Sequence, residues 1–440
     1  MYLATTLDMN DKTFIYDAKT NSYKEIPKEL YDRCIQDPSG ETFSKKEREK
    51  IKKLIGRDIF EKIEFKIALP YKKETLEYII NNNCNQLVLS ITESCNMRCE
   101  YCSYHNRYDP KYVAKDMSLE VAYKAIEMFL KRSKKLSSVV ISFYGGEPLV
   151  KLEFIKKCVE FSKQRSRGQH ILYHITTNGT LLDTETIDYL KENNFLICVS
   201  LDGPRELHDR YRIFKNRQPT YDIIINNLKL IRYKYPEYFY GNLIILSVYA
   251  KPYKDDILYD YFEKFPVEYV LNDLFITPYF KTILNKASKE ETRLTIKEKI
   301  TYPKFKRKHD NDLYKYRNID KPVAEIKKTF PAGSCIPACK KIYVNSKGKI
   351  FLCERINEDE KNCVGDVWSD ISIDSIYDQC TKLLNTFKKN NCKSCWAIHF
   401  CHFCFREIDD INEGKCARVK NRVRNEMISS IEHRYCETKD

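Results

Sequence analysis

The sequence predicts an α/β fold in which a sheet of parallel strands alternates with crossover helices. Between residues 81 and 280, short apolar segments alternate with longer amphipathic segments, which is typical of strands joined by helices. Polar or glycine-rich motifs follow several of these strands directly, at the strand ends where parallel α/β folds gather functional residues. The expected strands are 86–91, 138–143, 171–175, 195–201, 243–248 and 268–276.

The composition limits where the protein works and what it binds. The chain has 440 residues, enough for two or three domains. Its N-terminus does not resemble a signal peptide, and no apolar stretch of about 18 residues could span a membrane. We therefore expect a cytoplasmic protein whose 18 cysteines bind metal rather than form disulfides. The net charge of +14 could attract an acidic peptide, but no nucleic-acid-binding motif accompanies it.

The chain is expected to contain an N-terminal module, the α/β domain, a basic linker and a cysteine-rich domain. The expected segments are residues 1–80, 81–280, 281–330 and 331–440. The first segment begins with a β-hairpin over residues 13–26, and helices open at Pro27 and Ser44. A hairpin followed by short helices is typical of a winged-helix module, and a cap over the mouth of the α/β domain is the alternative.

Three cysteines lie on one short segment directly after the first strand of the α/β domain. Cys95, Cys99 and Cys102 have the spacing C-x3-C-x2-C. Three thiolates on one loop can bind three corners of a 4Fe–4S cluster and leave one iron open to a ligand. The alternative is one helix face carrying small buried thiols.

Further motifs follow the next three strands. Residues 143–149 (FYGGEPL) form a tight turn after the second strand, and residues 176–180 (TTNGT) form another after the third. Residues 200–205 (SLDGPR) follow the fourth strand, with residues 208–212 (HDRYR) just beyond. Each motif alone would also suit an ordinary turn, but together with the cysteine loop they predict a cofactor site.

These motifs together resemble those of the radical SAM superfamily, including the aromatic Tyr101 before the last cysteine. In that family the open iron binds S-adenosylmethionine, and one electron from the cluster releases a 5′-deoxyadenosyl radical that abstracts hydrogen from the substrate. The resemblance implies a partial (β/α)6, TIM-like barrel, with Cys95, Cys99 and Cys102 as catalytic cluster ligands. The residues that it implies for cofactor binding are Tyr101, Gly145, Gly146, Glu147, Pro148, Asn178, Ser200, Asp202 and Arg212.

The resemblance also implies individual roles. The Gly145–Glu147 turn would bind the amino group of S-adenosylmethionine, Ser200 its ribose and Arg212 its carboxylate. Asp202 would shape its turn or reach the substrate, and Asn178 fits either a structural turn or the site. Arg212 could instead form a surface salt bridge. Residues 216–220 (NRQPT) depart from the Gly-x-Gly-Ser turn that many relatives have at this point.

A second cysteine set lies in residues 331–440. Cys335 and Cys353 flank a hairpin that turns at residues 346–348. They are followed by Cys392, Cys395, Cys401 and Cys404, spaced C-x2-C-x5-C-x2-C, and by Cys416. On spacing alone, zinc and iron–sulfur clusters both fit this set.

This set resembles the SPASM domain, which holds two auxiliary 4Fe–4S clusters. The resemblance implies one cluster on Cys335, Cys353 and Cys404, and a second on Cys392, Cys395, Cys401 and Cys416. Cys339 could complete the first cluster, or that cluster could keep an open iron. The gap from Cys401 to Cys404 is one residue shorter than in the family pattern. The cysteines that match no motif are expected to be packed or surface thiols: Cys34, Cys84, Cys158, Cys198, Cys363, Cys380 and Cys436.

The resemblance implies an enzyme with three 4Fe–4S clusters that modifies a peptide. Cys353 is followed by Glu354, as in peptide maturases, whereas sulfatase-maturing enzymes have Cys-Asp. We therefore expect a maturase that joins a carbon of a ribosomal precursor peptide to a Cys sulfur. Its partners would be the leader of that precursor, added as a strand to the N-terminal module, and an electron-donating reductase. The alternatives are another side-chain modification, such as carbon–carbon crosslinking or Cys/Ser oxidation, and a zinc-knuckle binding protein without enzymatic activity.

Overall fold

The structure is a computed structural model that divides the chain into two compact units. The first unit comprises residues 1–75, 307–335 and 377–440, and the second comprises residues 76–306 and 336–376. The four predicted domain limits stay a prediction. The described residues are 4–9, 12–60, 64–102, 113–166, 168–248, 261–262, 269–273, 328–330, 337–338, 341–401, 403–407 and 411–437.

The second unit is built on a mixed sheet whose central part is parallel. Within the described residues its strand order is β10-β9-β8-β7-β6-β5-β12-β13-β14-β15, and every neighbouring pair from β10 to β12 is parallel. The six predicted strands are present, and the predicted parallel α/β fold is confirmed. The strands are β5 (Gln86–Thr92), β6 (Ser138–Gly145), β7 (His170–Thr177), β8 (Leu196–Ser200), β9 (Leu243–Val248), β10 (Tyr269–Asp273), β12 (Lys341–Val344), β13 (Lys349–Phe351), β14 (Gly365–Asp366) and β15 (Asp370–Ile371).

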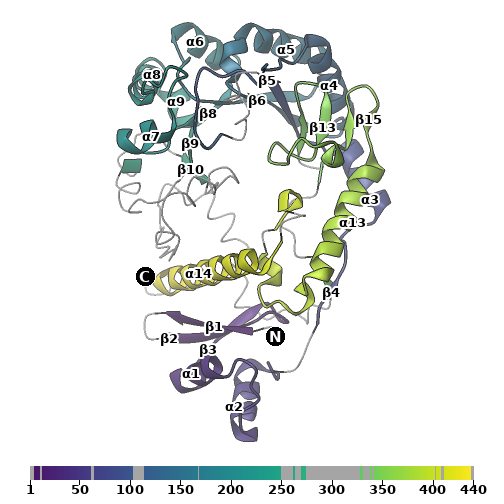
Figure 1. Cartoon of the computed structure of the whole chain (residues 1–440), viewed down its shortest axis with the longest axis vertical. Helices are drawn as coiled ribbons and strands as arrows, with labels where there is room; N and C mark the ends of the chain where they lie inside the picture. Colours follow the sequence, from purple (N-terminus) through teal and green to yellow (C-terminus); the bar gives the residue numbers. More distant parts are fainter. Residues whose placement is uncertain are drawn as a thin grey trace. The chain divides into compact units, whose positions relative to one another are not determined.

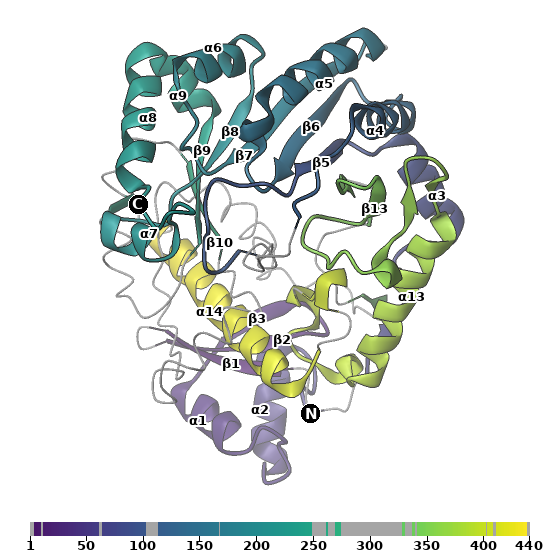
Figure 2. The same ribbon diagram turned by 45° about the horizontal axis from the view of Figure 1, so that its top comes forward.

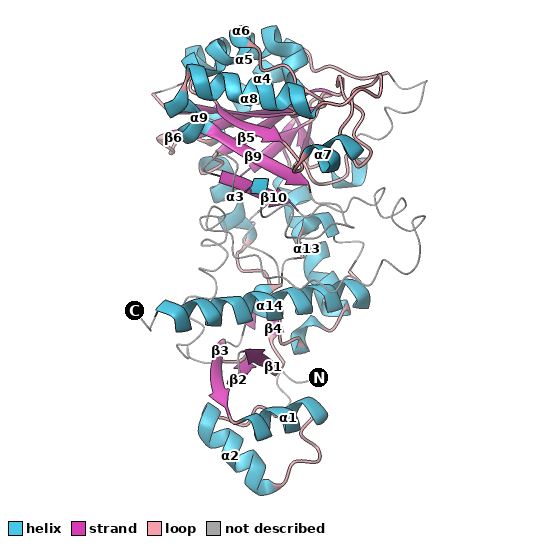
Figure 3. Ribbon diagram, turned by 90° about the vertical axis from the view of Figure 1, so that its left-hand side faces the viewer, coloured by secondary structure: helices cyan, strands magenta, loops and turns pink. Residues whose placement is uncertain are grey.

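Helices cover one face of this sheet. Figures 2 and 3 show α4, α5 and α6 along one face of the strands. Ile141, Phe143 and Ile175 on that face are fully buried, and Tyr173 reaches the Ser162 hydroxyl of α5 at 2.8 Å. Because side chains alternate along a strand, the residues between them point to the opposite face. The described α-helices of this unit are α4 (Leu119–Arg132), α5 (Leu152–Arg165), α6 (Thr184–Glu192), α7 (Arg205–Tyr211), α8 (Tyr221–Lys234), α9 (Pro236–Asn242) and most of α3 (Lys73–Asn82), which begins in the first unit.

The predicted C-terminal hairpin extends the sheet. β12 and β13 are antiparallel, and β12 pairs with β5 in parallel, with Lys341 opposite Gln86. The hairpin therefore places Cys353 and Glu354, which follow β13, in the same unit as the parallel strands. The unit boundary falls within α13 (Ile373–Lys389).

The first unit contains a three-stranded antiparallel sheet, β1 (Ala4–Met9), β2 (Lys12–Asp17) and β3 (Ser22–Ile26). The hairpin and both following helices, α1 (Lys28–Gln36) and α2 (Lys45–Ile55), match the prediction, whereas β1 was not predicted. Figure 1 shows α14 (Glu413–Glu437) along one face of this sheet and α1 and α2 on the other. The assignment of this module as a winged helix stays a prediction. A further parallel pair joins β4 (Lys66–Ile67) to β11 (Lys328–Thr329).

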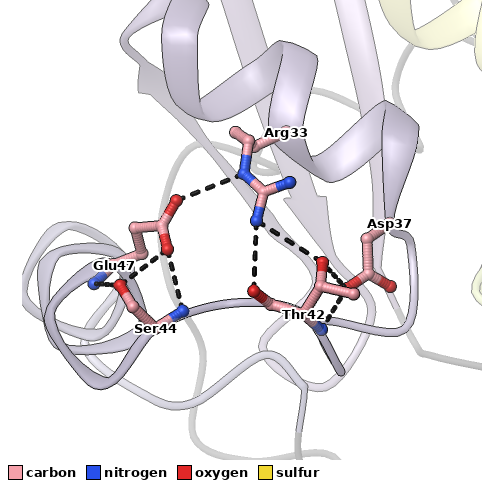
Figure 4. A network of polar contacts seen from close by, with 5 residues as sticks. All are labelled: Arg33, Asp37, Thr42, Ser44 and Glu47. Carbon is pink, nitrogen blue, oxygen red and sulfur yellow. Dashed lines mark hydrogen bonds and ion pairs between the residues drawn. The ribbon is translucent and has the colours of Figure 1, made fainter.

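A polar network fixes the turn between α1 and α2 (Figure 4). Ser44 and Glu47 form a capping box, in which the Glu47 N–H donates to Ser44 Oγ and the Ser44 N–H donates to Glu47 Oε2 at 2.8 Å. Arg33 donates to Glu47 at 3.2 Å and to the Thr42 carbonyl, and the Thr42 N–H donates to Asp37 at 2.7 Å. The network thus satisfies the N–H groups of Ser44 and Glu47 at the start of α2.

The two faces of β2 pack into different surroundings. Ile15 lies in an apolar core with Leu30, Phe43 and Ile51 from the two helices and the turn between them. Tyr16, on the other face, is fully buried against aromatic side chains of residues 396–400 in the same unit.

The predicted basic linker, residues 281–330, lies outside the described residues except for 328–330. Among the helices that the structure describes, none combines the length and apolar character needed to cross a bilayer.

Candidate cluster and cofactor site

Cys95, Cys99 and Cys102 lie close together on the loop that follows β5. Burial raises the pKa of Cys99 to about 12, the Arg212 guanidinium lowers it, and the charges of Cys102 and Cys95 raise it further. Mutual repulsion among three neighbouring thiolates is relieved when a positively charged metal site binds them. The three thiols are therefore the right kind of ligand for an iron–sulfur cluster. In the described part of the chain, no group of three His, Cys, Asp or Glu side chains is arranged to hold a metal ion.

The predicted glycine-rich turn lies directly against this loop. The Gly146 N–H donates to the Thr92 carbonyl at 2.7 Å, and the Glu147 N–H donates to the Ser94 carbonyl at 2.9 Å. A Cβ on Gly146 would lie 2.7 Å from the Ser94 carbonyl carbon and 2.9 Å from the Glu93 carbonyl oxygen. Glycine is therefore required here because the backbones of the turn and the loop are in contact.

Glu147 is a fully buried acid at the start of this turn. It accepts hydrogen bonds from Thr177 Oγ1 at 2.7 Å, the Asn178 N–H at 2.6 Å and the Leu149 N–H at 3.1 Å. Burial raises the pKa of Glu147 to about 7, and the hydrogen bonds oppose that rise. A carboxyl group that is costly to ionise in isolation is suited to a cationic ligand, such as an amino group.

Asn178 connects the turn after β7 with the cysteine loop. Its Nδ2 donates to Asn96 Oδ1 at 2.8 Å and lies 3.9 Å from Cys95 Sγ. Asn96 in turn donates to Thr180 Oγ1 at 2.8 Å. Asn178 therefore contacts the cysteine loop as well as its own turn, and its role in cofactor binding stays a prediction. Sequence reasoning missed Asn96, and its place directly after Cys95 was the available signal.

Asp202 and Arg212 form a buried ion pair beneath the cysteine loop. Arg212 Nε lies 3.0 Å from Asp202 Oδ2, and Arg212 and Asp202 are 8% and 4% exposed. Asp202 also accepts hydrogen bonds from the Tyr101 hydroxyl and from the Val248 N–H at 3.0 Å. The alternative of a surface salt bridge for Arg212 is therefore wrong. The predicted contact between Arg212 and the cofactor carboxylate stays a prediction.

His208, which sequence reasoning did not assign, supports Arg212 from behind. The Asp202 N–H donates to His208 Nδ1 at 3.3 Å, so the ring proton belongs on Nε2, which lies 3.0 Å from Thr220 Oγ1. Thr220 then donates to the Arg212 carbonyl at 2.7 Å. Burial and the Arg212 charge lower the pKa of His208 to about 2, so the ring is neutral. Ser200 ends β8 at this side of the sheet, and Pro148 is buried in the turn after Glu147.

The predicted second auxiliary set comes together in the first unit. Burial raises the pKa of Cys392 and of Cys401 to about 12, and the charges of Cys395 and Cys416 raise both further. These four thiols are neighbours, and a bound metal would relieve the repulsion among their thiolates, so they fit a metal site. His399 of this segment bonds its Nε2 to the Ala18 carbonyl at 2.7 Å.

The predicted first auxiliary set stays a prediction. Cys335 and Cys339 lie outside the described residues, and Cys353 and Cys404 belong to different units. Beside Cys353, both carboxylate oxygens of Glu354 accept from Lys341 Nζ, at 2.9 and 3.1 Å. The cysteines without a motif are buried where their side chains are described, except half-buried Cys363.

A row of polar side chains on the sheet face opposite the helices was not predicted. Gln86 Nε2 donates to Ser142 Oγ at 2.8 Å, Ser142 Oγ lies 3.1 Å from His174 Nδ1, and His174 Nε2 lies 3.1 Å from Cys198 Sγ. Burial, followed by the Lys341 charge, lowers the pKa of His174 to about 4. These residues come from four neighbouring strands, so no local motif could have revealed the row.

Comparisons with known proteins concern the domain that carries these residues. The Radical SAM superfamily matches residues 89–248. A serine-type anaerobic sulfatase-maturating enzyme of Bacteroides thetaiotaomicron is 34% identical over 190 residues, which are 42% of this chain and 44% of that protein. A cysteine-type anaerobic sulfatase-maturating enzyme of Clostridium novyi is 31% identical over 185 residues, which are 41% of this chain and 48% of that protein. The chain thus spans about half the length of these curated relatives.

A solved structure supports the fold independently. Native anSMEcpe with bound AdoMet superposes with a TM-score of 0.53 at 20% identity, over 78% of this chain and 100% of that one. At this level of identity the likeness concerns the fold alone.

Proposed function

From the premise that this chain is a radical SAM enzyme, with its radical SAM domain over residues 89–248, we propose that it oxidatively modifies a peptide side chain. The specific proposal is a thioether, in which the sulfur of a precursor Cys is joined to a carbon of another residue. The partners proposed with it are the leader of the precursor peptide and an electron-donating reductase.

A radical SAM domain implies a 4Fe–4S cluster and S-adenosylmethionine, which together supply a 5′-deoxyadenosyl radical for hydrogen abstraction. Cys95, Cys99 and Cys102 would hold that cluster. Glu147 and the backbone of its turn would bind the amino group of S-adenosylmethionine. The four thiols of Cys392, Cys395, Cys401 and Cys416 would hold an auxiliary cluster, and the remaining set, including Cys339, would hold another.

The observation that carries the proposal is the joining of three strand ends by hydrogen bonds. Gly146 and Glu147 donate to the cysteine loop, and Glu147 accepts from the turn at Thr177 and Asn178. A loop with three thiols, a buried acid and a glycine turn therefore converge at neighbouring strand ends. This arrangement orients a bound cofactor and limits its contact with water.

The identity of residue 354, a glutamate, favours thioether formation over sulfatase-type oxidation, although a carboxylate here could serve either reaction. A substrate thiol must lose its proton when its sulfur bonds to carbon, and a carboxylate can accept that proton. Lys341 Nζ lies 2.9 Å from Glu354 Oε1, and this contact holds the carboxylate beside Cys353. Glu354 also differs from the aspartate that sulfatase-maturing enzymes have after the equivalent cysteine.

Oxidation of a Cys or Ser side chain is the second candidate. The similarity to serine-type and cysteine-type anaerobic sulfatase-maturating enzymes favours it, since both names refer to such a side chain. In this case the substrate would be a protein segment and no ring would form.

Mass spectrometry separates the two candidates. The anaerobically reconstituted enzyme is incubated with S-adenosylmethionine, a reductant and either a Cys-containing peptide encoded beside its gene or a sulfatase-derived Cys peptide. Thioether formation removes about two hydrogens per crosslink, as oxidative bond formation requires, and protects the Cys from alkylation. Sulfatase-type oxidation replaces the thiol by a carbonyl that reacts with hydrazides. The Cys95/Cys99/Cys102→Ala variant is the control, and an unchanged mass for both peptides contradicts the proposal.

A further inference from the structure

The ion pair beneath the cysteine loop has a charge that faces a proposed cluster ligand. Arg212 Nη1 lies 4.0 Å from Cys99 Sγ, while its Nε is bound to Asp202. The guanidinium also lies over the Tyr101 ring, 5.4 Å from its centroid. A buried cation is thus fixed on one side by a carboxylate and on another by an aromatic ring, with its remaining side toward a thiol.

Asp202 holds this arrangement through three hydrogen bonds. Its Oδ2 accepts from Arg212 Nε and from the Tyr101 hydroxyl, and its Oδ1 accepts from the Val248 N–H. Its position fixes the charge of Arg212 relative to Cys99, and His208 and Thr220 fix the Arg212 backbone.

Charges this close to an iron–sulfur cluster alter its reduction potential. One-electron reduction makes the cluster more negative, so a nearby cation favours the reduced form and a nearby anion opposes it. Both side chains are buried, so solvent and salt screen their effects only weakly. The cation lies nearer to the thiol, and the anion lies behind it.

We propose that Asp202 and Arg212 are positioning residues that set the reduction potential of the cluster on Cys95, Cys99 and Cys102. Arg212 raises the potential through its charge near Cys99, and Asp202 limits that rise while keeping the guanidinium in place. The inference rests on the proposed function only in taking Cys99 as a cluster ligand.

The inference predicts shifts of opposite sign for the two charge-changing variants. Arg212→Gln removes the cation and leaves the carboxylate, so the potential falls. Asp202→Asn removes the anion and leaves the cation, so the potential rises. Tyr101→Phe removes a hydrogen bond to Asp202 without a change of charge, and it serves as the matched control with the smallest shift. If these residues had only a structural role, all three variants would contain less cluster, and the reduction potentials of Arg212→Gln and Asp202→Asn would not shift in opposite directions.

The experiment is a redox titration of the full chain, reconstituted anaerobically and followed by electron paramagnetic resonance without S-adenosylmethionine. The signal of interest is the one absent from the Cys95/Cys99/Cys102→Ala variant. Persistence of every signal in that variant would show that the ligand assignment is wrong. If the assignment holds, equal potentials or shifts of the same sign in Arg212→Gln and Asp202→Asn overturn the inference. If Arg212→Gln binds no cluster, the Asp202→Asn variant alone decides. In that case the inference is refuted if the reduction potential of Asp202→Asn is not higher than that of the wild type.

Discussion

A methyl group added at Gly146 tests the contact on which the proposed site depends. In Gly146→Ala the new Cβ would lie 2.7 Å from the carbonyl carbon of Ser94 and 2.9 Å from the carbonyl oxygen of Glu93. Both atoms belong to the backbone of the cysteine loop, so neither can rotate aside as a flexible side chain would. The loop or the turn must shift, and the hydrogen bond from Gly146 to Thr92 must lengthen.

The size of the effect follows from the rigidity of the two backbones. Overpacking of a buried site costs about 1–3 kcal/mol, and contacts between backbones belong at the upper end of that range. A cost of about 3 kcal/mol lowers the population of the correctly folded loop by roughly 100-fold, at about 1.4 kcal/mol for each factor of ten. We therefore expect Gly146→Ala to lose the cluster bound by Cys95, Cys99 and Cys102.

The assay counts iron and sulfide per chain and follows the paramagnetic signal that the Cys95/Cys99/Cys102→Ala variant lacks. Gly241→Ala is the matched control, because nothing lies within 4 Å of a Cβ at that position in α9. Alanine is about 0.5–1 kcal/mol better than glycine inside a helix, so this control is expected to keep its iron and its stability. A Gly146→Ala protein with full cluster content and an unchanged signal would refute the reasoning.

Three further predictions concern stability. The pKa of Glu147, raised from 4.5 to about 7 by burial, means that the folded state holds this proton more tightly than the unfolded state. The resulting stability is present below about pH 4.5 and is lost, by about 3 kcal/mol, as the pH rises through about 7. Urea unfolding without S-adenosylmethionine should therefore show that stability falls more steeply between pH 5 and 8 in the wild type than in Glu147→Gln, and parallel curves would contradict this. Tyr16→Ala should destabilise the N-terminal sheet by about 3–5 kcal/mol, whereas Tyr16→Phe, which loses only the 2.8 Å hydrogen bond to Asn21, should lose about 1 kcal/mol. Hydrogen exchange of β1–β3 measures both losses, and equal protection in the two variants would count against the packing argument. Ser44→Ala removes the capping box of α2 and should cost about 1 kcal/mol, seen as faster exchange at the start of α2, while unchanged exchange there would show that Glu47 and Arg33 suffice.

The parallel strands and their terminal motifs were predictable because their signals are local. Alternation of apolar and amphipathic segments fixed the bounds of β5–β9 to within about two residues, the usual uncertainty of an element boundary, and β10 lies within its predicted range, whose last residues are outside the described part of the chain. The cysteine spacing and the glycine-rich turn were visible for the same reason. The hydrogen bonds that join them, from Glu147 to Asn178 and from Asn178 to Asn96, link residues far apart in the sequence. Only the order of neighbouring strands brings those residues together.

Other features were beyond the sequence because they depend on packing between distant segments. The residues of β1 (ATTLDM) do not alternate strictly between apolar and polar, so the Asn10-Asp11 pair before β2 was the available signal; β1 is defined by its antiparallel register with β2. The choice between surface and buried roles for Arg212 depends on Asp202, ten residues earlier, and on the cover given by Tyr101. A charged residue is normally expected at the surface unless a partner is known, and the partner could be identified only in three dimensions.

The aromatic packing of Tyr16 gives the C-terminal cysteines a structural consequence of their own. Within the first unit, Tyr16 packs against Trp396 and Phe400, with ring centroids 6.4 and 5.9 Å apart, and these two residues lie between Cys395 and Cys401. His399 fixes the same segment to Ala18, and Phe65 donates its N–H to the Lys393 carbonyl at 2.9 Å. Since metal binding orders the loop that supplies the ligands, a cluster on these cysteines would also order the surface on which β2 packs. The sheet proposed to receive a leader peptide and the proposed auxiliary cluster would then share one core, so that loss of the cluster weakens both.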